Sequence, residues 1–337
     1  MNKKIIFIAE AGVNHNGSLK NALKLVDIAS KAGADYVKFQ LTNSNLISKT
    51  ATKAKYQKKF TKRKQETQYE MIKKYELNWD LAHKKIIERC KKKKINFLTT
   101  AFSEADAKKV KKLKVKMFKI PSGEITNIPL IKFIGSLNKK TLLSTGMSSI
   151  EEVDFAIKTL LNNGLNKKKL VILQCTSAYP TPIKDLNLNT IRYFKKKYKV
   201  EVGLSDHSLG TLAPVVAIGL GAKYIEKHFT ISKNLIGPDH KTSLSPKELY
   251  KLVKDIRDTE QSLGSYTKKV TKSEKVNQLL ARQSIHTKKK INKGEFFTKQ
   301  NLILKRPGTG LSPNKLKKII GKKAKKNYFE DQIVKTL

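Results

Sequence analysis

The chain has 337 residues, which is enough for a large first domain followed by a small second one. Hydrophobic residues make up 39% of the chain, enough for a folded core, and no run of about 18 apolar residues would span a bilayer. The first apolar run ends at Glu10, before it reaches the length of a secretory core. We therefore expect a soluble, cytoplasmic protein.

The net charge of +44 would suit a protein that binds nucleic acid or an anionic membrane. Only six of the basic residues are arginines, and the lysines are spread over every predicted helix. Arginine is the residue that usually makes bidentate contacts with bases and phosphates. We interpret the charge as a solvated lysine-rich surface and expect neither a specific nucleic acid nor a membrane as partner. Cys90 and Cys175 are too few for a disulfide framework and are expected to be free.

Short β-branched or aromatic runs alternate with amphipathic stretches of helical length through the first three quarters of the chain. This alternation is typical of a parallel sheet wrapped by helices. The eight expected strands are 5–10, 36–40, 97–100, 117–121, 141–144, 171–176, 201–205 and 224–229. Eight strand and helix units in about 250 residues are the size of a closed (β/α)8 barrel, a TIM barrel, which we expect over residues 1–264 as the catalytic domain.

Three segments depart from this regular alternation. Residues 41–81 are too long for an ordinary strand-to-helix connection, and a functional lid or a solvated charged helix explains them equally well. Residues 265–282 are polar and read as a linker. Residues 283–337 contain short β-rich runs with glycine and proline turns, which predicts a small β-dominated domain. A domain of that size is marginal by itself, so we expect it to dock onto a barrel.

Polar side chains stand at the carboxyl end of nearly every expected strand. A barrel brings all these ends to one mouth, where barrel enzymes build their sites. The residues concerned are Glu10, Lys38, Gln40, Thr100, Lys119, Ser122, Ser144, Thr176, Ser177, Ser205, Asp206, His207, Glu226 and His228. The pattern predicts a single polar pocket.

Lysines inside two of these strands indicate the charge of the ligand. Lys38 and Lys119 would point into a confined pocket and need partners to stay charged. Two lysines at one mouth predict a doubly anionic ligand that carries a carboxylate and a phosphate. Further hydrogen bonds to this anion would come from hydroxyl groups, those of Thr100, Ser122, Ser144 and Ser205.

The seventh and eighth strands end in a pattern that is typical of a metal site. His207 follows Asp206, and His228 lies two residues after Glu226. Two imidazoles on neighbouring strands can meet at one ion, with the carboxylates orienting their far ring nitrogens. A divalent metal is expected, with Mn2+ the best fit and Mg2+ or Co2+ as alternatives. The lack of a thiolate partner argues against structural zinc.

Nine motifs of the sequence resemble, in order and over nearly the whole chain, the bacterial N-acetylneuraminate (sialic acid) synthase family. They are AEAGVNHNG, ADYVKFQ, FKIPSGEITNIPL, LLSTGM, QCTSAYPTP, VGLSDHS, YIEKHFT, GPDHKTS and KRPGTGLSP. The resemblance implies a (β/α)8 barrel joined to an antifreeze-like (SAF) domain, in a homodimer where each small domain covers the partner's barrel mouth. It also implies a metal-dependent transferase that condenses phosphoenolpyruvate with N-acetylmannosamine and water to give N-acetylneuraminate and phosphate.

The same resemblance assigns roles to individual residues. Phosphoenolpyruvate would be held by Lys38, Thr100, Lys119, Ser122, Ser144, Ser177 and Ser205. The sugar would contact Gln40, Tyr179, Asp239 and, from the partner copy, Arg306, which reaches the N-acetyl group. His207 and His228 would bind the metal. The catalytic residues are expected to be Glu10, Lys119 and Glu124, with water activated by Glu124 or by the metal.

Three alternatives remain open from the sequence. Within the family, a 2,4-diacetamido trideoxy sugar could replace N-acetylmannosamine, which would make the chain a legionaminic acid synthase. A strand lysine could instead form a Schiff base, as in an aldolase that needs no metal. A protein that binds RNA or a membrane through its net charge is the third, and its binding would collapse with salt.

Overall fold

The structure is a computed structural model that describes residues 4–61 and 65–336. The chain divides into two compact units, Met1–Gly264 and Ser265–Leu337, and each is described here by itself. Within the described ranges, no helix combines the length and the apolar character needed to cross a membrane.

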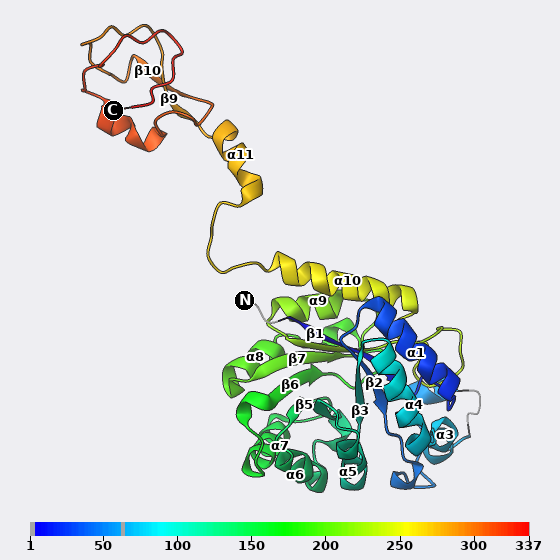
Figure 1. Cartoon of the computed structure of the whole chain (residues 1–337). Coiled ribbons are helices and arrows are strands. Elements are labelled where there is room, and N and C mark those ends of the chain that lie inside the picture. The colour runs from blue at the N-terminus through cyan, green and yellow to red at the C-terminus, as the bar shows by residue number, and fades with distance from the viewer. Residues whose placement is uncertain (1–3, 62–64, 337) are drawn as a thin grey trace. The chain divides into compact units, whose positions relative to one another are not determined.

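The first unit is a closed barrel of eight parallel strands in sequential order (Figure 1). The strands are β1 (Ile6–Gly12), β2 (Tyr36–Gln40), β3 (Asn96–Thr100), β4 (Met117–Ile120), β5 (Lys140–Ser144), β6 (Leu170–Cys175), β7 (Glu201–Asp206) and β8 (Tyr224–His228). The predicted TIM barrel is thus confirmed, and each predicted strand end lies within two residues of the observed one.

Helices cover the outside of the barrel (Figure 1). They are α1 (Leu19–Ala32), α4 (Trp79–Lys92), α5 (Glu104–Lys112), α6 (Ile128–Ser136), α7 (Ile150–Asn162), α8 (Thr190–Tyr198), α9 (Leu212–Gly219) and α10 (Pro246–Ser262). Two further helices, α2 (Lys55–Phe60) and α3 (Gln68–Tyr75), belong to the connection between β2 and α4. Local sequence sets their limits, as α1 illustrates. The Ser18 side chain accepts the Asn21 N–H at the start, and Gly33 adopts the left-handed conformation at the end.

The strands pack against two hydrophobic layers, one on each face of the sheet. The larger lies between the strands and the helices, and the smaller fills the barrel interior. The interior layer consists of Ile8, Tyr36, Leu98, Met117, Leu142, Val171, Leu173 and Tyr224. On β1, buried Ile8 is followed two positions later by Glu10, on the same face of the strand. The apolar layer therefore forms a floor below the polar residues at the carboxyl ends.

The long connection between β2 and α4 folds against the barrel. It contains η1 (Ser44–Leu46), α2 and α3, and Met71 and Tyr75 of α3 form a buried cluster with Val13. A buried ion pair, 3.1 Å between Lys53 Nζ and Glu66 Oε2, closes part of the segment. A solvated charged helix would not bury these groups, so the structure favours the lid alternative. Residues 62–64 of this segment lie outside the described residues.

The second unit is small and contains a two-stranded antiparallel sheet, in the part of the chain where short β-rich runs were predicted. Helix α11 (Lys272–Ala281) precedes the antiparallel pair β9 (Ser284–Thr287) and β10 (Leu302–Lys305), and η5 (Pro313–Lys315) and α12 (Leu316–Ile319) follow. Its core contains Ile285, Ile291, Phe297, Leu302, Ile319, Ala324, Tyr328 and Val334.

A buried histidine on α4 makes the stability of the first unit depend on pH. His83 contacts Trp79 and Phe97, with ring centroids 4.9 and 5.7 Å apart. Burial lowers the pKa of His83 to about 4 from an ordinary value of 6.5. Between these two values the unfolded chain binds a proton that the folded chain does not. The free energy of unfolding therefore decreases as the pH falls through this window.

Replacing His83 with glutamine is expected to remove this contribution. Between about pH 5 and 6, the free energy of unfolding of the wild type should fall faster than that of the variant, by about 1 kcal/mol per pH unit. Urea unfolding followed by the fluorescence of Trp79, the single tryptophan, measures it. His286→Gln is the control, because His286 lies in the second unit. Equal slopes for the wild type and His83→Gln would contradict the expectation.

Candidate functional site

A cavity of about 380 Å³ opens at the carboxyl ends of the barrel strands. It brings together most of the side chains predicted from the strand ends. The predicted residues that line it are Glu10, Lys38, Gln40, Thr100, Lys119, Ser122, Ser144, Ser177, Tyr179, Ser205, His207 and His228. The single polar pocket expected from the sequence is present.

Two lysines and two carboxylates form the buried charged centre of this cavity. Lys38 Nζ lies 2.9 Å from Glu10 Oε1 and 3.7 Å from Glu226 Oε1. Lys119 Nζ lies 2.8 Å from Glu226 Oε1, which also accepts a hydrogen bond from Ser205. Strand register explains the cluster, because Glu10 pairs with Lys38 on β2 and with His228 on β8. The lysines are therefore neutralised within the protein in the absence of ligand.

Burial and neighbouring charge set the pKa values in this cluster. Burial acts to lower the pKa of Lys38, but Glu10 and Glu226 outweigh it and raise that pKa. Burial lowers the pKa of Lys119, although Glu226 opposes the shift. Burial would raise the pKa of Glu226, yet the two lysines hold it well below its usual range. Burial raises the pKa of Glu10 despite Lys38. Glu226 is thus the ionised carboxylate, and Glu10 the one closer to accepting a proton.

Hydroxyl groups line the cavity beside Gly146. Ser122 Oγ accepts the Gly146 N–H at 2.9 Å. A Cβ added at Gly146 would lie 2.3 Å from Ser177 Oγ and 2.9 Å from Ser122 Oγ. Ser144 Oγ is buried and has no hydrogen-bond partner among the described residues. A bound ligand with acceptor oxygens would satisfy that donor.

The two candidate metal ligands face one another. The ring centroids of His207 and His228 are 5.5 Å apart. His207 Nδ1 lies 3.0 Å from the Thr176 carbonyl oxygen, and its Nε2 lies 3.0 Å from Tyr179 Oη. His228 Nδ1 is buried without a partner among the described residues. With metal–nitrogen distances of about 2.1 Å, rings at this separation fit a shared ion.

The expected orientation of the histidines by carboxylates is wrong. Asp206 accepts hydrogen bonds from Ser208 and pairs with Lys227, and Glu226 pairs with the lysines of the cavity. The Thr176 carbonyl oxygen orients His207 instead, because it accepts a hydrogen bond from a protonated Nδ1 and leaves Nε2 as the potential ligand. Within the described residues, no cluster of three or more His, Cys, Asp or Glu side chains is arranged for a metal. A metal at these two histidines would therefore need ligands from water or substrate.

Glu124 and Asp239, two residues predicted for the site, do not line the cavity. Glu124 lies in η2 (Ser122–Glu124), and its carboxylate accepts a hydrogen bond of 2.7 Å from Asn127, the N-cap of α6. Asp239 is buried nearby, and burial together with Glu10 raises its pKa to about 7. Arg306 is exposed after β10 in the second unit. The predicted role of Glu124 in activating water has no geometric support here.

The polar side chains of the AEAGVNHNG motif mainly form hydrogen bonds to the segment that follows β8. Asn14 donates to the Phe229 carbonyl and to Ser243 Oγ, at 2.8 and 2.9 Å. Asn16 Oδ1 lies 3.0 Å from His240 Nε2. Gly12, with φ of 52°, allows close approach of His228, whose ring would lie 3.1 Å from a Cβ there. Of the polar groups in this motif, only Glu10 lines the cavity.

The sequence predicted Glu226 in the pocket but not its partners, because its carboxylate pairs with both lysines and not with a histidine. Other residues of the cavity were not predicted. Cys175 was treated as structural, yet it lines the cavity, with Sγ 3.8 Å from His207 Nδ1. The long connection adds Ala54, Tyr56, Gln57 and Gln68. The length of that connection was the one available signal for the last group.

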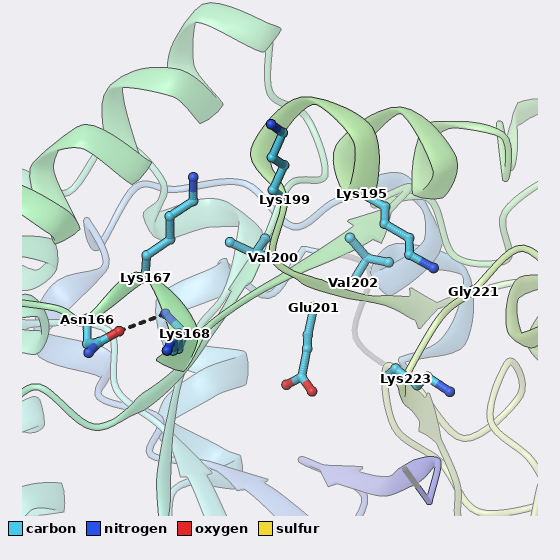
Figure 2. A pocket seen from close by; sticks show the side chains of 10 residues that line it. All are labelled: Asn166, Lys167, Lys168, Lys195, Lys199, Val200, Glu201, Val202, Gly221 and Lys223. Carbon is cyan, nitrogen blue, oxygen red and sulfur yellow. Dashed lines mark hydrogen bonds between the residues drawn. The ribbon is translucent and has the colours of Figure 1, made fainter. Parts of the chain in front are cut away.

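A larger hollow of about 680 Å³ lies at the amino ends of β7 and β8. It is lined by Asn166, Lys167, Lys168, Lys195, Lys199, Val200, Glu201, Val202, Gly221 and Lys223. Figure 2 shows that the lysine amines do not converge on one point. In barrel enzymes the opposite end of the strands carries the chemistry, so we assign the site to the smaller cavity.

Comparisons with known proteins identify the family of the chain. A family model described as the NeuB family matches residues 25–268, and a SAF domain model matches residues 282–336. The N,N'-diacetyllegionaminic acid synthase of Campylobacter jejuni is 46% identical, over 99% of both chains. That of Legionella pneumophila is 43% identical, over 95% of this chain and 90% of its own. The crystal structure of N-acetylneuraminic acid (sialic acid) synthetase from Leptospira borgpetersenii, with citrate, has a TM-score of 0.71 at 33% identity, covering 82% and 90%.

Proposed function

The chain belongs to the NeuB family, with a SAF domain at its C-terminal end, and from this premise we propose that it is an N,N'-diacetyllegionaminic acid synthase. Carbon 3 of phosphoenolpyruvate would form a bond to the aldehyde carbon of a 2,4-diacetamido-2,4,6-trideoxymannose. Water would add at carbon 2, and the carbon–oxygen bond to phosphate would break, releasing inorganic phosphate. The observation that carries this proposal is the pair of buried lysines beside His207 and His228 in one cavity.

The relatives favour the diacetamido sugar over N-acetylmannosamine, the acceptor first expected from the sequence. The two relatives at 46% and 43% identity are legionaminic acid synthases, whereas the sialic acid synthetase structure is 33% identical. Phosphoenolpyruvate itself fits the charges of the cavity. Its carboxylate and phosphate would replace the internal carboxylates as partners of Lys38 and Lys119, and Ser144 would donate its unused hydroxyl.

A divalent metal, with Mn2+ as our first choice, fits at His207 and His228. His228 Nδ1 is an unpartnered buried atom. His207 Nδ1 bonds to the Thr176 carbonyl, so Nε2 is the nitrogen that would bind the metal, in exchange for its contact with Tyr179 Oη. Cys175 lies on the Nδ1 side of His207, away from that nitrogen. The metal would supply Lewis-acid polarisation of the aldehyde oxygen.

Glu10 is the best-placed group to move a proton during the reaction. It is buried in the cavity, its Oε2 has no partner among the described residues, and burial raises its pKa. A carboxyl group with a raised pKa is suited to exchange protons near neutral pH. We therefore assign proton transfer at the reacting water to Glu10 in preference to Glu124, which bonds to Asn127.

Release of phosphate from phosphoenolpyruvate tests the proposed function. The purified protein is incubated with Mn2+ and the diacetamido trideoxy sugar, N-acetylmannosamine or no sugar, each with and without chelator. We expect sugar-dependent, chelator-sensitive release that is fastest with the diacetamido sugar. Release fastest with N-acetylmannosamine would make the chain a sialic acid synthase. No release with either sugar would overturn the proposal, and trapping of pyruvate by borohydride would then favour the aldolase.

Alanine at position 146 is expected to weaken phosphoenolpyruvate binding. The new methyl group would push Ser177 and Ser122 out of place, because it would lie within 2.9 Å of both hydroxyls. Loss of one neutral hydrogen bond weakens binding by roughly tenfold. KM for phosphoenolpyruvate should therefore rise at least about tenfold. Gly123→Ala is the matched control, since Gly123 lines the same cavity but a Cβ there has nothing within 4 Å. Equal KM values for the two variants would argue against the assignment of these serines.

The role of Arg306 stays a proposal. The family resemblance puts this residue on the N-acetyl group of the acceptor bound to the partner copy, so the active form would be a homodimer. Mass measurement in solution and mixing of an Arg306→Ala variant with an inactive barrel variant would test it. Recovered activity in the mixture would show that one copy completes the site of another.

A further inference from the structure

One wall of the cavity comes from outside the barrel strands, and the proposed function gives its residues no role. The wall is formed by Ala54, Tyr56, Gln57 and Gln68. The buried Lys53–Glu66 ion pair holds this part of the chain, and Lys53 also donates to Thr61 at 2.9 Å. The wall is therefore a folded feature of the site.

This wall adjoins the place where the acceptor aldehyde would react. The ring of Tyr56 stacks on the ring of Tyr179, with centroids 4.8 Å apart and planes at 24°. The Tyr179 ring in turn lies 4.1 Å from the His207 ring. A sugar whose aldehyde oxygen points toward His207 would thus extend along Tyr56 and its neighbours.

The chemistry of the wall suits a neutral ligand that carries amide groups. Its four side chains are uncharged, and they offer an aromatic face, a methyl group and two carboxamides. Phosphoenolpyruvate would find its charge partners at Lys38 and Lys119 instead. Ligand sites of this kind combine apolar surface with a few polar groups that fix orientation.

The two glutamines of the wall differ in what their amides already do. Gln57 Oε1 accepts the Ala54 N–H at 2.9 Å, and its Nε2 donates to Tyr56 Oη at 3.3 Å. The Gln68 carboxamide has no hydrogen-bond partner among the described residues. Its backbone is nevertheless fixed at the start of α3, where its N–H donates to the Ala51 carbonyl at 2.8 Å. Gln68 presents a free donor and a free acceptor on an anchored backbone.

We infer that Gln68 determines acceptor specificity by pairing with the acetamido group at carbon 4 of the sugar. The acetamido oxygen would accept a hydrogen bond from Gln68 Nε2, while the acetamido N–H, which points the opposite way in a trans amide, would not contact this side chain. N-acetylmannosamine carries only a hydroxyl at carbon 4, whose oxygen lies closer to the sugar ring and would not reach Nε2. The inference rests on the proposed function and names the part of the same site that selects the substrate.

The test compares kcat/KM for the diacetamido sugar with that for N-acetylmannosamine, in the wild type and in Gln68→Met. Methionine has a similar length but no amide. We expect the ratio of the two values to fall about tenfold, with KM for phosphoenolpyruvate unchanged. Gln68→Asn keeps an amide but shortens the side chain, and it should lower the ratio in the same direction. Gln261→Met, on the exposed end of α10, is the matched control and should leave the ratio unchanged.

Two results would overturn the inference while leaving the proposed function intact. One is a ratio in Gln68→Met within about twofold of the wild-type value, and the other is an equal loss with both sugars, which indicates a structural role. Thermal unfolding of each variant shows whether it folds as the wild type does. A wild type that releases no phosphate with either sugar would instead remove the proposed function and this inference together.

Discussion

Replacing Lys119 with methionine is expected to lower kcat/KM for phosphoenolpyruvate by about 10²–10³-fold, the usual effect of removing one donor that faces developing charge. Lys119 is buried, and its ammonium group lies 2.8 Å from Glu226. In the proposed reaction this group faces the phosphoenolpyruvate dianion. Without it, Lys38 alone would have to balance the charges of the ligand and of Glu226, which lies 3.7 Å from Lys38. Steady-state phosphate release at varied phosphoenolpyruvate concentration measures the effect.

A control variant at another strand lysine, Lys140, distinguishes this effect from a general loss of folding. Lys140 begins β5 and pairs with Glu201 at the other end of the barrel. Lys140→Met should therefore keep kcat/KM within about threefold of the wild type, the range expected when a partly exposed ion pair is lost. Similar losses in the two variants would argue against a special role for Lys119, as would an unchanged Lys119→Met enzyme.

Replacing either His207 or His228 with alanine is expected to abolish tight Mn2+ binding and to lower kcat by about 10³-fold, because a Lewis acid supplies several kcal/mol to the barrier reduction. The two rings face each other at 5.5 Å, so each variant would leave only one imidazole. Electron paramagnetic resonance of free Mn2+ measures binding without relying on activity. Chelation of the wild type should have the same effect as the substitutions, and added Mn2+ should reverse it.

The control for the metal prediction is the same His83→Gln variant used for the pH dependence. His83 is also buried, but it contacts Trp79 and Phe97 on the outside of the barrel. It should bind Mn2+ as the wild type does. If His207→Ala and His228→Ala bound Mn2+ with unchanged affinity, the site would have to lie elsewhere. Full activity in the presence of chelator would remove the metal from the mechanism.

The amino-acid sequence by itself determined the architecture and predicted the cavity that holds the candidate site. Strand and helix periodicities are local properties, so alternating apolar runs identified all eight strands to within two residues. A parallel barrel then brings every carboxyl end to one mouth. This topological rule explains why residues as distant as Glu10, Lys119 and His228 could be predicted to share one cavity.

Only the tertiary structure decided which groups contact each other within that cavity. The sequence predicted that Glu226 would orient His228. In the structure its carboxylate pairs with Lys38 and Lys119, which lie on other strands. Glu124 follows a predicted strand, yet capping of α6 by Asn127 draws it out of the cavity lining. Hydrogen-bond partners depend on strand register and on side-chain direction, which no local pattern of residues encodes.

The position of the wall that contains Gln68 also could not be predicted from the sequence. Residues 41–81 carry no regular pattern that reports on burial, and their charge made a solvated helix equally plausible from the sequence. Packing of Met71 and Tyr75 against Val13, together with the Lys53–Glu66 pair, directs this segment to the barrel mouth. These contacts join residues far apart in the chain, so their free energy exists only in the folded state, and only the fold could place an amide beside the proposed acceptor.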